Sequence, residues 1–143
     1  MIRDGIENAF DIMIDLIPIV ISWGTIGLLI ANKTNIMQII SYPMGLFLNL
    51  FNVQDAFKVA PATLVGFIDM FIPALIIGHD VEVKTRFIIG VLSLIQIIYL
   101  TEVGSIILKS GVDINIKKLF LIFIERTIIS LPIIILLSNI IPM

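Results

Sequence analysis

The chain has 143 residues, of which 59% are hydrophobic and only 14% are charged, and its formal net charge is −2. Soluble domains carry about 25% charged residues, so nine Lys plus Arg and eleven Asp plus Glu are too few to form a polar shell around a core of this size. The composition excludes an ordinary soluble domain and predicts that most of the apolar surface faces lipid.

Several kinds of chemistry are excluded as well. Cys is absent, so disulfides, thiolate metal sites and a cysteine nucleophile are ruled out. The single histidine, His79, excludes a metal site made of several histidines from one chain, and the scattered basic residues form no stripe for nucleic acid. We find no catalytic carboxylate pair, phosphate-binding glycine loop or GxSxG motif, and therefore expect no enzyme, cofactor or metal.

The first predicted element is a membrane span over residues 12–31. These roughly 20 mostly apolar residues are long enough to cross about 30 Å of hydrocarbon, and they are too long and too interrupted for a cleaved signal peptide. Pro18 predicts a kink, and Gly24 and Gly27 offer a flat surface for another helix. Asp15, near the start of the span, is expected to reach towards the headgroups.

Residues 35–78 contain no uninterrupted span, because Pro, Gly, Asn and charged residues cut the apolar runs. Irregular backbone at membrane depth is tolerated only where protein or water covers it. We therefore predict a re-entrant, broken hairpin in the protein interior. Two short spans joined by a loop are the alternative.

Two further spans are predicted over residues 86–108 and 117–141, joined by a polar turn. In this turn Gly111 marks a helix end, and Asp113 or Asn115 would cap the next helix. The chain is thus expected to be one all-α, polytopic membrane domain covering residues 1–143.

The number of crossings is odd in either interpretation, which places the termini on opposite sides of the membrane. Loop Lys and Arg normally fix orientation. Here one side would receive Arg3, Lys109, Lys117 and Lys118 and the other would receive Lys33, Lys84 and Arg86. A bias of four against three is almost none, so insertion in both orientations is one hypothesis. The alternative is one orientation with the 109–118 loop in the cytoplasm.

Charged groups inside the spans need partners, because each costs roughly 2.5–3.5 kcal/mol at the bilayer centre. Glu102 and Arg126 both lie about 10 Å from the same membrane face, at 1.5 Å per residue. We predict an ion pair between them, with Glu125 as a second acceptor in the same layer. This cluster would either lock two helices together or take part in binding.

Two other places are candidates for a ligand or ion. Thr101, Glu102 and Gly104 suit a break in the third span that exposes carbonyls, with Gln96 as a neutral companion; the alternative is an intact helix with interhelical hydrogen bonds. Asp69, between Gly66 and Pro73, would cap a second half-helix or contact a cation or polar ligand.

Four segments carry a family resemblance: VGFIDMFIPA (65–74), TRFIIG (85–90), YLTEVG (99–104) and LFLIFIERTIISLPI (119–133). They resemble the YjiH family of bacterial membrane proteins, which carry the nucleoside recognition or Gate domain. The resemblance covers about the last 80 residues well and the first 60 only by general pattern. It implies a transport-like scaffold in which Gly66 to Pro73 form a hairpin tip and Thr101 to Gly104 form a break, both lining a substrate site.

Family members are longer and hold two such units, whereas this chain holds one. An odd number of crossings would make two fused units inverted repeats. We therefore expect a half-length form that pairs with a second copy, antiparallel in one version, or with a homologous second half. The expected function is a dimeric transport core for a small polar solute, for which a nucleoside-related compound is one candidate, in the bacterial inner membrane. A structural or assembly protein of the same fold that transports nothing is the alternative.

Overall fold

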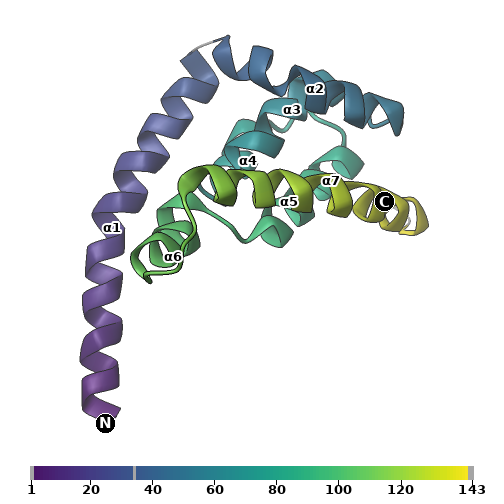
Figure 1. Cartoon of the computed structure of the whole chain (residues 1–143). Coiled ribbons are helices and arrows are strands. Elements are labelled where there is room, and N and C mark those ends of the chain that lie inside the picture. Colours follow the sequence, from purple (N-terminus) through teal and green to yellow (C-terminus); the bar gives the residue numbers. More distant parts are fainter. Residues whose placement is uncertain (1, 34, 142–143) are drawn as a thin grey trace.

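The computed structural model of the chain describes residues 2–33 and 35–141, and every regular element in these residues is helical (Figure 1). The longer helices are α1 (Ile2–Lys33), α2 (Ile36–Leu50), α5 (Val83–Gln96) and α7 (Ile116–Ile140). The shorter ones are α3 (Ala56–Val65), α4 (Ile72–Ile76), the π-helical turn η1 (Leu100–Gly104) and α6 (Ser105–Lys109). The all-α prediction is confirmed.

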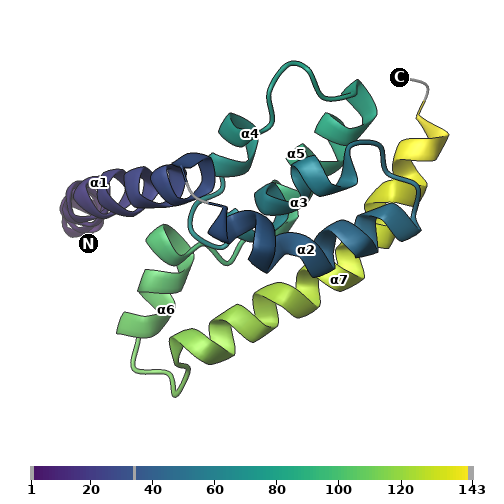
Figure 2. The ribbon, with the colours of Figure 1, turned by 90° about the horizontal axis from the view of Figure 1, so that it is seen from above.

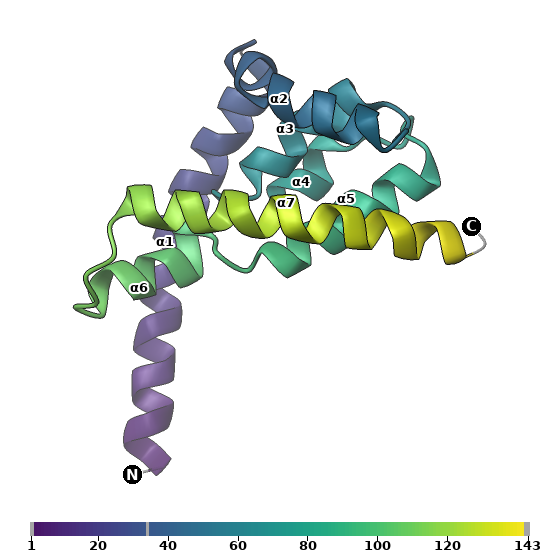
Figure 3. The ribbon, with the colours of Figure 1, turned by 45° about the vertical axis from the view of Figure 1, so that its right-hand side comes forward.

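Helix α1 contains the predicted span 12–31 and continues through Pro18. Its N-terminal half extends away from the other helices, and the helix runs across the direction of α7 (Figures 1 and 3). Towards its C-terminus α1 contacts α4 and η1. A Cβ placed on Gly27 would lie 2.9 Å from the Cδ1 of Ile72, so Gly27 makes the predicted close contact, whereas nothing lies within 4 Å of such an atom on Gly24.

The region 35–78 is broken, as predicted. Helices α2 and α3 pack against each other as a hairpin, joined by a short turn in which Asn52 and Asp55 have φ values of 55° and 56°. Asn and Asp adopt this left-handed conformation more readily than other non-glycine residues. Residues 66–71 then form a non-helical tip before α4. No helix in this region exceeds the 15 residues of α2.

Two helical stretches, Val83–Leu108 and Ile116–Ile140, are long and apolar enough to cross a membrane. Only 39% and 33% of their most apolar windows are buried within the chain, so most of their apolar surface faces outward, unlike that of a core helix in a soluble protein. The accessible surface of 8939 Å² also exceeds the roughly 7,400 Å² expected of a compact soluble protein of this mass.

The core lies where α2, α3, α5 and α7 meet. It is built from buried aliphatic side chains on all four helices, among them Leu48, Val59, Ala62, Ile88, Leu92, Leu131 and Ile134. In the view from above α2 and α7 run past each other (Figure 2), with α2 higher in the molecule (Figure 1), and the two helices together with Leu64 of α3 border an apolar groove of about 350 Å³. The face of α7 turned towards the core carries Leu119, Phe123, Thr127, Leu131 and Ser138.

The connection before α7 follows the sequence closely. Helix α6 ends at Lys109, and Gly111 has a φ of +77°, which glycine adopts without a Cβ penalty. The side chain of Asn115 accepts a hydrogen bond from the backbone N–H of Lys118 at 2.9 Å. The prediction that Asp113 or Asn115 caps the last helix is thus confirmed for Asn115.

Candidate functional site

The first part of the site is the tip between α3 and α4, residues 66–71. Backbone N–H groups of the tip return to the last turn of α3, where they bond to the carbonyls of Ala62, Leu64 and Val65 at 2.8–3.4 Å. The remaining carbonyl of that turn, on Thr63, accepts the side-chain amide of Gln96 at 2.9 Å. The helix therefore ends inside the protein with its last four carbonyls satisfied.

The second part is a break in the apolar stretch Val83–Leu108, at residues 97–99, between α5 and η1. Ile97 has φ +58° and ψ −31°, a genuine outlier for a β-branched residue. The N–H of Ile98 donates across it to the carbonyl of Gln96 at 2.6 Å, which is the three-residue turn that strains the backbone most. Such conformations cost about 1–3 kcal/mol and persist only where the surroundings enforce them.

The surroundings of the break supply donors for the end of α5. Its last four carbonyls belong to Ser93, Leu94, Ile95 and Gln96, and those of Ser93, Ile95 and Gln96 each accept a hydrogen bond. The Tyr99 hydroxyl donates to Ser93 at 2.6 Å and lies 3.4 Å from the oxygen of Leu94. Arg126 Nη2, from α7, donates to Ile95 at 3.0 Å. A guanidinium at this position also matches the negative end of the helix dipole.

The tip and the break bind each other through their backbones. The N–H of Leu100 donates to the carbonyl of Phe67 at 2.8 Å, and that of Thr101 donates to Ile68 at 3.3 Å. The first N–H groups of η1, which a helix start leaves without partners, are thus satisfied by the hairpin tip. The two interruptions of regular structure are therefore one feature, although about 30 residues separate them in the sequence.

Gln96 joins the tip, the break and α7. Its amide nitrogen donates to Thr63 of α3 and, at 2.8 Å, to the hydroxyl of Thr127 on α7. Its Oε1 is buried and has no hydrogen-bond partner among the described residues. That oxygen lies over Gly66, where an added Cβ would approach it to 2.4 Å. A side chain at position 66 would therefore require Gln96 to shift.

Asp69 is the buried carboxylate of the site, with 3% of its surface exposed. One oxygen accepts the N–H of Phe71 at 2.8 Å, and the other lies 3.4 Å from the hydroxyl of Thr101. Asp69 forms no ion pair with any described residue. Glu102, the residue after Thr101, is half-buried. The Asp69 carboxylate and the Thr101 hydroxyl thus lie together where the tip contacts η1.

The prediction that Asp69 caps the second half-helix is wrong: the N-cap of α4 is Phe71, and no side chain caps this helix. The Asp69 carboxylate instead accepts the N–H of Phe71, two residues further along, in a turn that precedes the helix. Pro73 lies in the first turn of α4, where a missing N–H costs nothing, and it is buried.

The predicted ion pair between Glu102 and Arg126 does not form. Arg126 instead caps the end of α5, and the side chain of Glu102 makes no hydrogen bond or ion pair within residues 2–33 and 35–141. The depth argument placed both groups in the same layer, but the break changes the direction of the chain before Glu102. An open carbonyl at the end of α5 is then the nearer acceptor for the guanidinium.

The predicted break also lies elsewhere. It was expected at Thr101 to Gly104, whereas the irregular backbone is at residues 97–99 and residues 100–104 form a π-helical turn. Gly104 matters for a different reason: a Cβ there would come within 2.9 Å of the carbonyl oxygen of Tyr99, which accepts the N–H of Gly104 at 2.7 Å.

Glu125 does not share the layer of Glu102 as an acceptor. It is exposed on α7 and has no hydrogen bond or ion pair with the residues that the structure describes. It faces away from the tip and the break, which are on the opposite side of α7.

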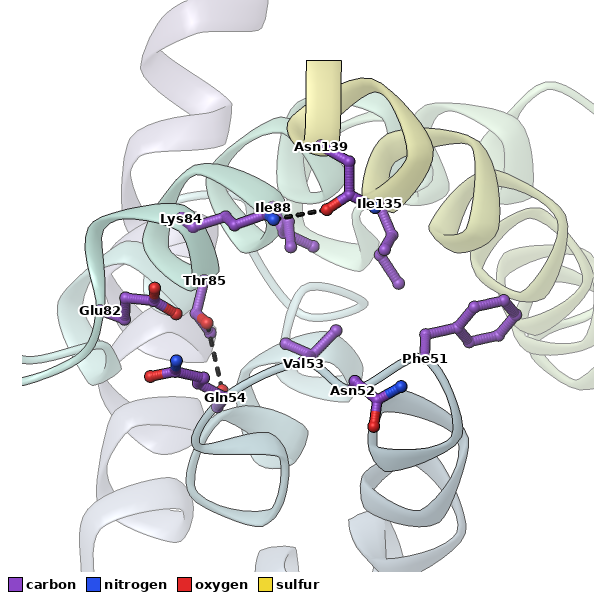
Figure 4. Close-up of a pocket in the computed structure, with 10 residues that line it drawn as sticks. All are labelled: Phe51, Asn52, Val53, Gln54, Glu82, Lys84, Thr85, Ile88, Ile135 and Asn139. Carbon is purple, nitrogen blue, oxygen red and sulfur yellow. Dashed lines mark hydrogen bonds between the residues drawn. The ribbon is translucent and has the colours of Figure 1, made fainter. Parts of the chain in front are cut away.

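A separate polar cavity of about 100 Å³ lies at the other end of α5 (Figure 4). Its walls come from the turn between α2 and α3, the start of α5 and the end of α7. Lys84 donates to the side chain of Asn139, and the Thr85 hydroxyl donates to the carbonyl of Gln54 at 3.1 Å. These contacts tie the ends of three elements together, and none of the predicted site residues lines this cavity.

Sequence reasoning missed four residues that build the site: Thr63, Ile97, Tyr99 and Thr127. Tyr99 follows Gln96 by three residues, and that spacing was a usable signal because both side chains are polar in an apolar run. Nothing local marks Thr63 or Thr127, because each acts through a partner about 30 residues away. No group of three or more His, Asp or Glu residues suited to a metal ion occurs in the described part of the chain.

Comparison with known proteins adds one relative. An uncharacterized protein of Alkalihalophilus pseudofirmus is 42% identical over 137 residues, which cover 95% of this chain and 29% of the relative. The chain thus spans less than a third of the length of that protein. No protein-family model and no solved structure matches the chain.

Proposed function

We propose that the chain is a multi-pass protein of a bacterial cytoplasmic membrane and forms part of a transport core for a small polar solute. In this proposal α5 with α6, and α7, cross the bilayer. Helices α3 and α4 are the arms of a re-entrant hairpin. The resemblance to Gate-domain proteins makes nucleoside-related compounds the first solutes to test.

The observation that carries the proposal is the contact between the hairpin tip and the helix break. Residues 97–99 lie near the middle of the apolar stretch Val83–Leu108, which corresponds to the middle of the bilayer if that stretch crosses it. Irregular backbone at this depth occurs where protein buries it or where it lines a cavity, and in many transporters it forms the substrate site. Here it coincides with a strained Ile97 and a buried Asp69 that has no cationic partner among the described residues.

The residues of this contact have distinct roles in the proposal. Asp69 and Glu102 would supply negative charge for a coupling cation or a positively polarised solute group. Thr101 would position the Asp69 carboxylate, and the free Oε1 of Gln96 would accept a hydrogen bond from the solute once the tip moves aside. Gly66, Pro73 and Gly104 would shape the backbone around these groups.

The proposed core needs more than one chain of this length. Most of the apolar surface of α5 and α7 faces outward, and the relative from A. pseudofirmus is more than three times as long as the matched region. We propose that a second copy, or a homologous second half, completes the core.

A second candidate is a structural membrane protein of the same fold that transports nothing. The observation that favours it is the set of donors at the end of α5, which reaches the carbonyls of Ser93, Ile95 and Gln96, because a break held in this way suits a fixed scaffold. A transporter would instead need the tip and the break to separate during its cycle.

Uptake into proteoliposomes separates the two candidates. Purified protein would be reconstituted, and uptake of radiolabelled uridine and adenosine would be measured with and without an inward Na⁺ or H⁺ gradient. We expect gradient-dependent uptake by the wild type, loss of uptake in Asp69→Asn, and normal uptake in Asp113→Asn. Asp113 is a matched control because it is an exposed carboxylate in the turn before α7.

Thermal unfolding in detergent gives a second readout that does not depend on reconstitution. Sodium chloride, compared with choline chloride, should raise the unfolding temperature of the wild type but not that of Asp69→Asn. If uptake is absent and neither Na⁺ nor nucleosides stabilise the protein, the scaffold function is favoured and the transport proposal fails.

A further inference from the structure

The outward face of α7 carries a stripe of exposed side chains that is apolar except at one point. The stripe runs opposite the buried face of the helix and consists of Ile122, Glu125, Ile129, Ile133, Leu136 and Ile140. The spacing of three and four residues keeps these side chains on one side of the helix. Figure 3 shows α7 lying along the outside of the molecule.

The exception, Glu125, is badly placed for lipid. It comes nine residues after the start of α7 at Ile116, which is about 14 Å along the helix and therefore deep in a bilayer that α7 crosses. A carboxylate at this depth needs a partner. It has none among the described residues, although Arg126 follows it directly and donates a hydrogen bond to the carbonyl of Ile95.

Adjacent charges of opposite sign give this stripe a self-complementary pattern. Glu125 and Arg126 point about 100° apart on their own helix and do not satisfy each other. Across a two-fold axis, however, any contact of Glu125 with Arg126 of a second copy is repeated by its symmetry mate. Two ion pairs would then form where the isolated chain has an unpartnered carboxylate.

We infer that α7 packs antiparallel against α7 of a second copy through this stripe, with Glu125 of each chain paired to Arg126 of the other. This register also places Ile122 opposite Ile129, and it brings the exposed Lys118, one turn before Ile122 on the same face of the helix, opposite Ile133. Arg126 lies at the edge of the stripe, so its other guanidinium nitrogens can reach across while one remains bound to Ile95.

A parallel pair is disfavoured because it would bring Glu125 next to Glu125 of the other chain in a medium where like charges repel strongly. An antiparallel pair also aligns the helix dipoles favourably. It requires two copies inserted in opposite directions, which agrees with the nearly even distribution of Lys and Arg between the two predicted sides.

The inference rests on the membrane assembly proposed above, but it does not require transport. A protein that forms the α7 pair and takes up no solute would refute only the transport proposal. A protein that transports without the α7 pair would refute only this interface.

Disulfide cross-linking in native membranes tests the register. Because the sequence contains no Cys, each single-cysteine variant has only the introduced thiol to cross-link. Ile122→Cys and Ile129→Cys, carrying different tags and expressed together, should cross-link to each other. Leu136→Cys should not cross-link to itself, because an antiparallel pair separates the two copies of that residue by roughly 30 Å, far beyond the Cα separation of about 7 Å that a disulfide tolerates.

Antiparallel and parallel pairs of α7 predict different cross-links. Self-linking of Leu136→Cys would indicate a parallel pair and overturn the inference. Failure of all three variants to cross-link while the protein remains folded and membrane-inserted would do the same. Cross-linking of either stripe position to a different protein would show that this face has another occupant.

Charge reversal tests the ion pairs within the same assay. In the mixed Ile122→Cys and Ile129→Cys sample, Glu125→Arg should lower the cross-linked fraction by roughly tenfold or more, and adding Arg126→Glu to the same chain should restore it. Because Arg126 also caps α5, the doubly changed chain must first be shown to unfold at a temperature near that of the wild type. A folded double variant that does not regain cross-linking would show that the pair does not form.

Discussion

Asp69 and Glu125 are both carboxylates in apolar surroundings, but they differ in burial and in hydrogen-bond partners. Asp69 is 3% exposed and accepts hydrogen bonds from a backbone N–H and a hydroxyl close by. Glu125 is exposed on an outward-facing helix and has no partner in the described part of the chain. The first belongs to a region that satisfies its own polar groups, and the second to a region that depends on another molecule.

The same contrast holds for the backbone around them. At the tip and the break, most of the last carbonyls of α3 and α5 accept hydrogen bonds from donors within the chain. Along α7 the backbone is helical, and Pro132 has no N–H for the carbonyl of Ile128. The irregular backbone of the tip and the break is therefore held by the chain itself, although the side chain of Ile97 is 45% exposed, whereas Glu125 on α7 is exposed without a partner among the described residues.

The largest effect is expected from filling the space under Gln96. Gly66→Ala places a methyl group where only 2.4 Å is free, so Gln96 must move and give up its bonds to Thr63 and Thr127. Overpacking and two lost hydrogen bonds together predict a loss of about 2–4 kcal/mol, measured by thermal unfolding in detergent. Gly90→Ala is the control, because nothing lies within 4 Å of an added Cβ there and Ala is the better helix residue.

Equal unfolding temperatures for the Gly66 and Gly90 variants would contradict the close approach of Gln96. They would also remove the argument that the tip and the break form one tightly fitted unit.

The next effect concerns the donors at the end of α5. Arg126→Met keeps the apolar stem but leaves the carbonyl of Ile95 without its donor, at a cost of about 1–3 kcal/mol. Tyr99→Phe removes the donor to Ser93 and should cost about 1 kcal/mol. Both are measured as changes in the unfolding temperature in detergent, where a wild-type value for either variant would show that the break needs no such cap.

A double-mutant cycle decides whether Glu102 and Arg126 interact. Since the structure pairs Arg126 with Ile95 and not with Glu102, the effects of Glu102→Gln and Arg126→Gln should add within about 0.5 kcal/mol in the double variant. A coupling energy well above that value would restore the ion pair that the sequence suggested.

Much of the helix arrangement around the tip and the break could be predicted from the sequence. Pro, Gly and charged residues in the apolar runs revealed the broken region 35–78, Gly111 and Asn115 marked the last turn, and Gly27 marked a helix contact. These signals are local: each depends on the conformational preference or size of one residue, so a single sequence contains them.

The exact break and its partners could not be predicted in this way. The positive φ of Ile97 contradicts the preference of a β-branched residue, and it is held by Tyr99, Arg126 and the tip, which lie elsewhere in the chain. The choice of Arg126 between Glu102 and a carbonyl depends on the direction of the chain after the break. Such choices are set by tertiary contacts that leave no local pattern.

A smaller effect separates the two carboxylates directly. In detergent, at a concentration where the chain is monomeric, Asp69→Asn should cost about 1 kcal/mol, because an amide nitrogen replaces one of two accepting oxygens. Glu125→Gln should change stability by no more than about 0.5 kcal/mol, as expected of an exposed residue without partners. Unfolding temperatures of the two variants, measured side by side, test this difference.

Glu125→Gln should have the larger effect of the two variants when pairing of the chains is measured instead of the stability of the fold. In membranes Glu125→Gln should reduce the fraction of paired chains, whereas Asp69→Asn should leave it unchanged. If both variants lower the stability of the fold equally and neither changes the fraction of paired chains, the contrast between the two carboxylates is wrong: Asp69 would not stabilise the fold more than Glu125 does, and Glu125 would not be an interface residue.

The smallest effect is expected at the base of the hairpin, where Lys58 of α3 and Asp80 of the loop after α4 form an ion pair at 2.5 Å. The hydrogen bond from Lys58 lowers the pKa of Asp80 below its usual 3.8, and the same bond raises the pKa of Lys58 above 10.5. The side chains are 48% and 70% exposed, so water and salt screen the pair and its contribution is small.

The sign of the pH dependence follows from these directions. Because the pKa of Asp80 is lower in the folded chain, the pair stabilises the fold above pH 3.8 and this stabilisation is lost as the pH falls through the lower, folded value. Asp80→Asn should therefore unfold at a slightly lower temperature than the wild type at neutral pH, and the difference should shrink in acid and in high salt. Glu82→Gln, which removes an exposed carboxylate two residues away that has no ion pair with a described residue, should show neither trend. An Asp80 variant that matches this control at every pH would mean that the hairpin base is held by its apolar contacts alone, and that ionic contacts matter only on the outer face of α7.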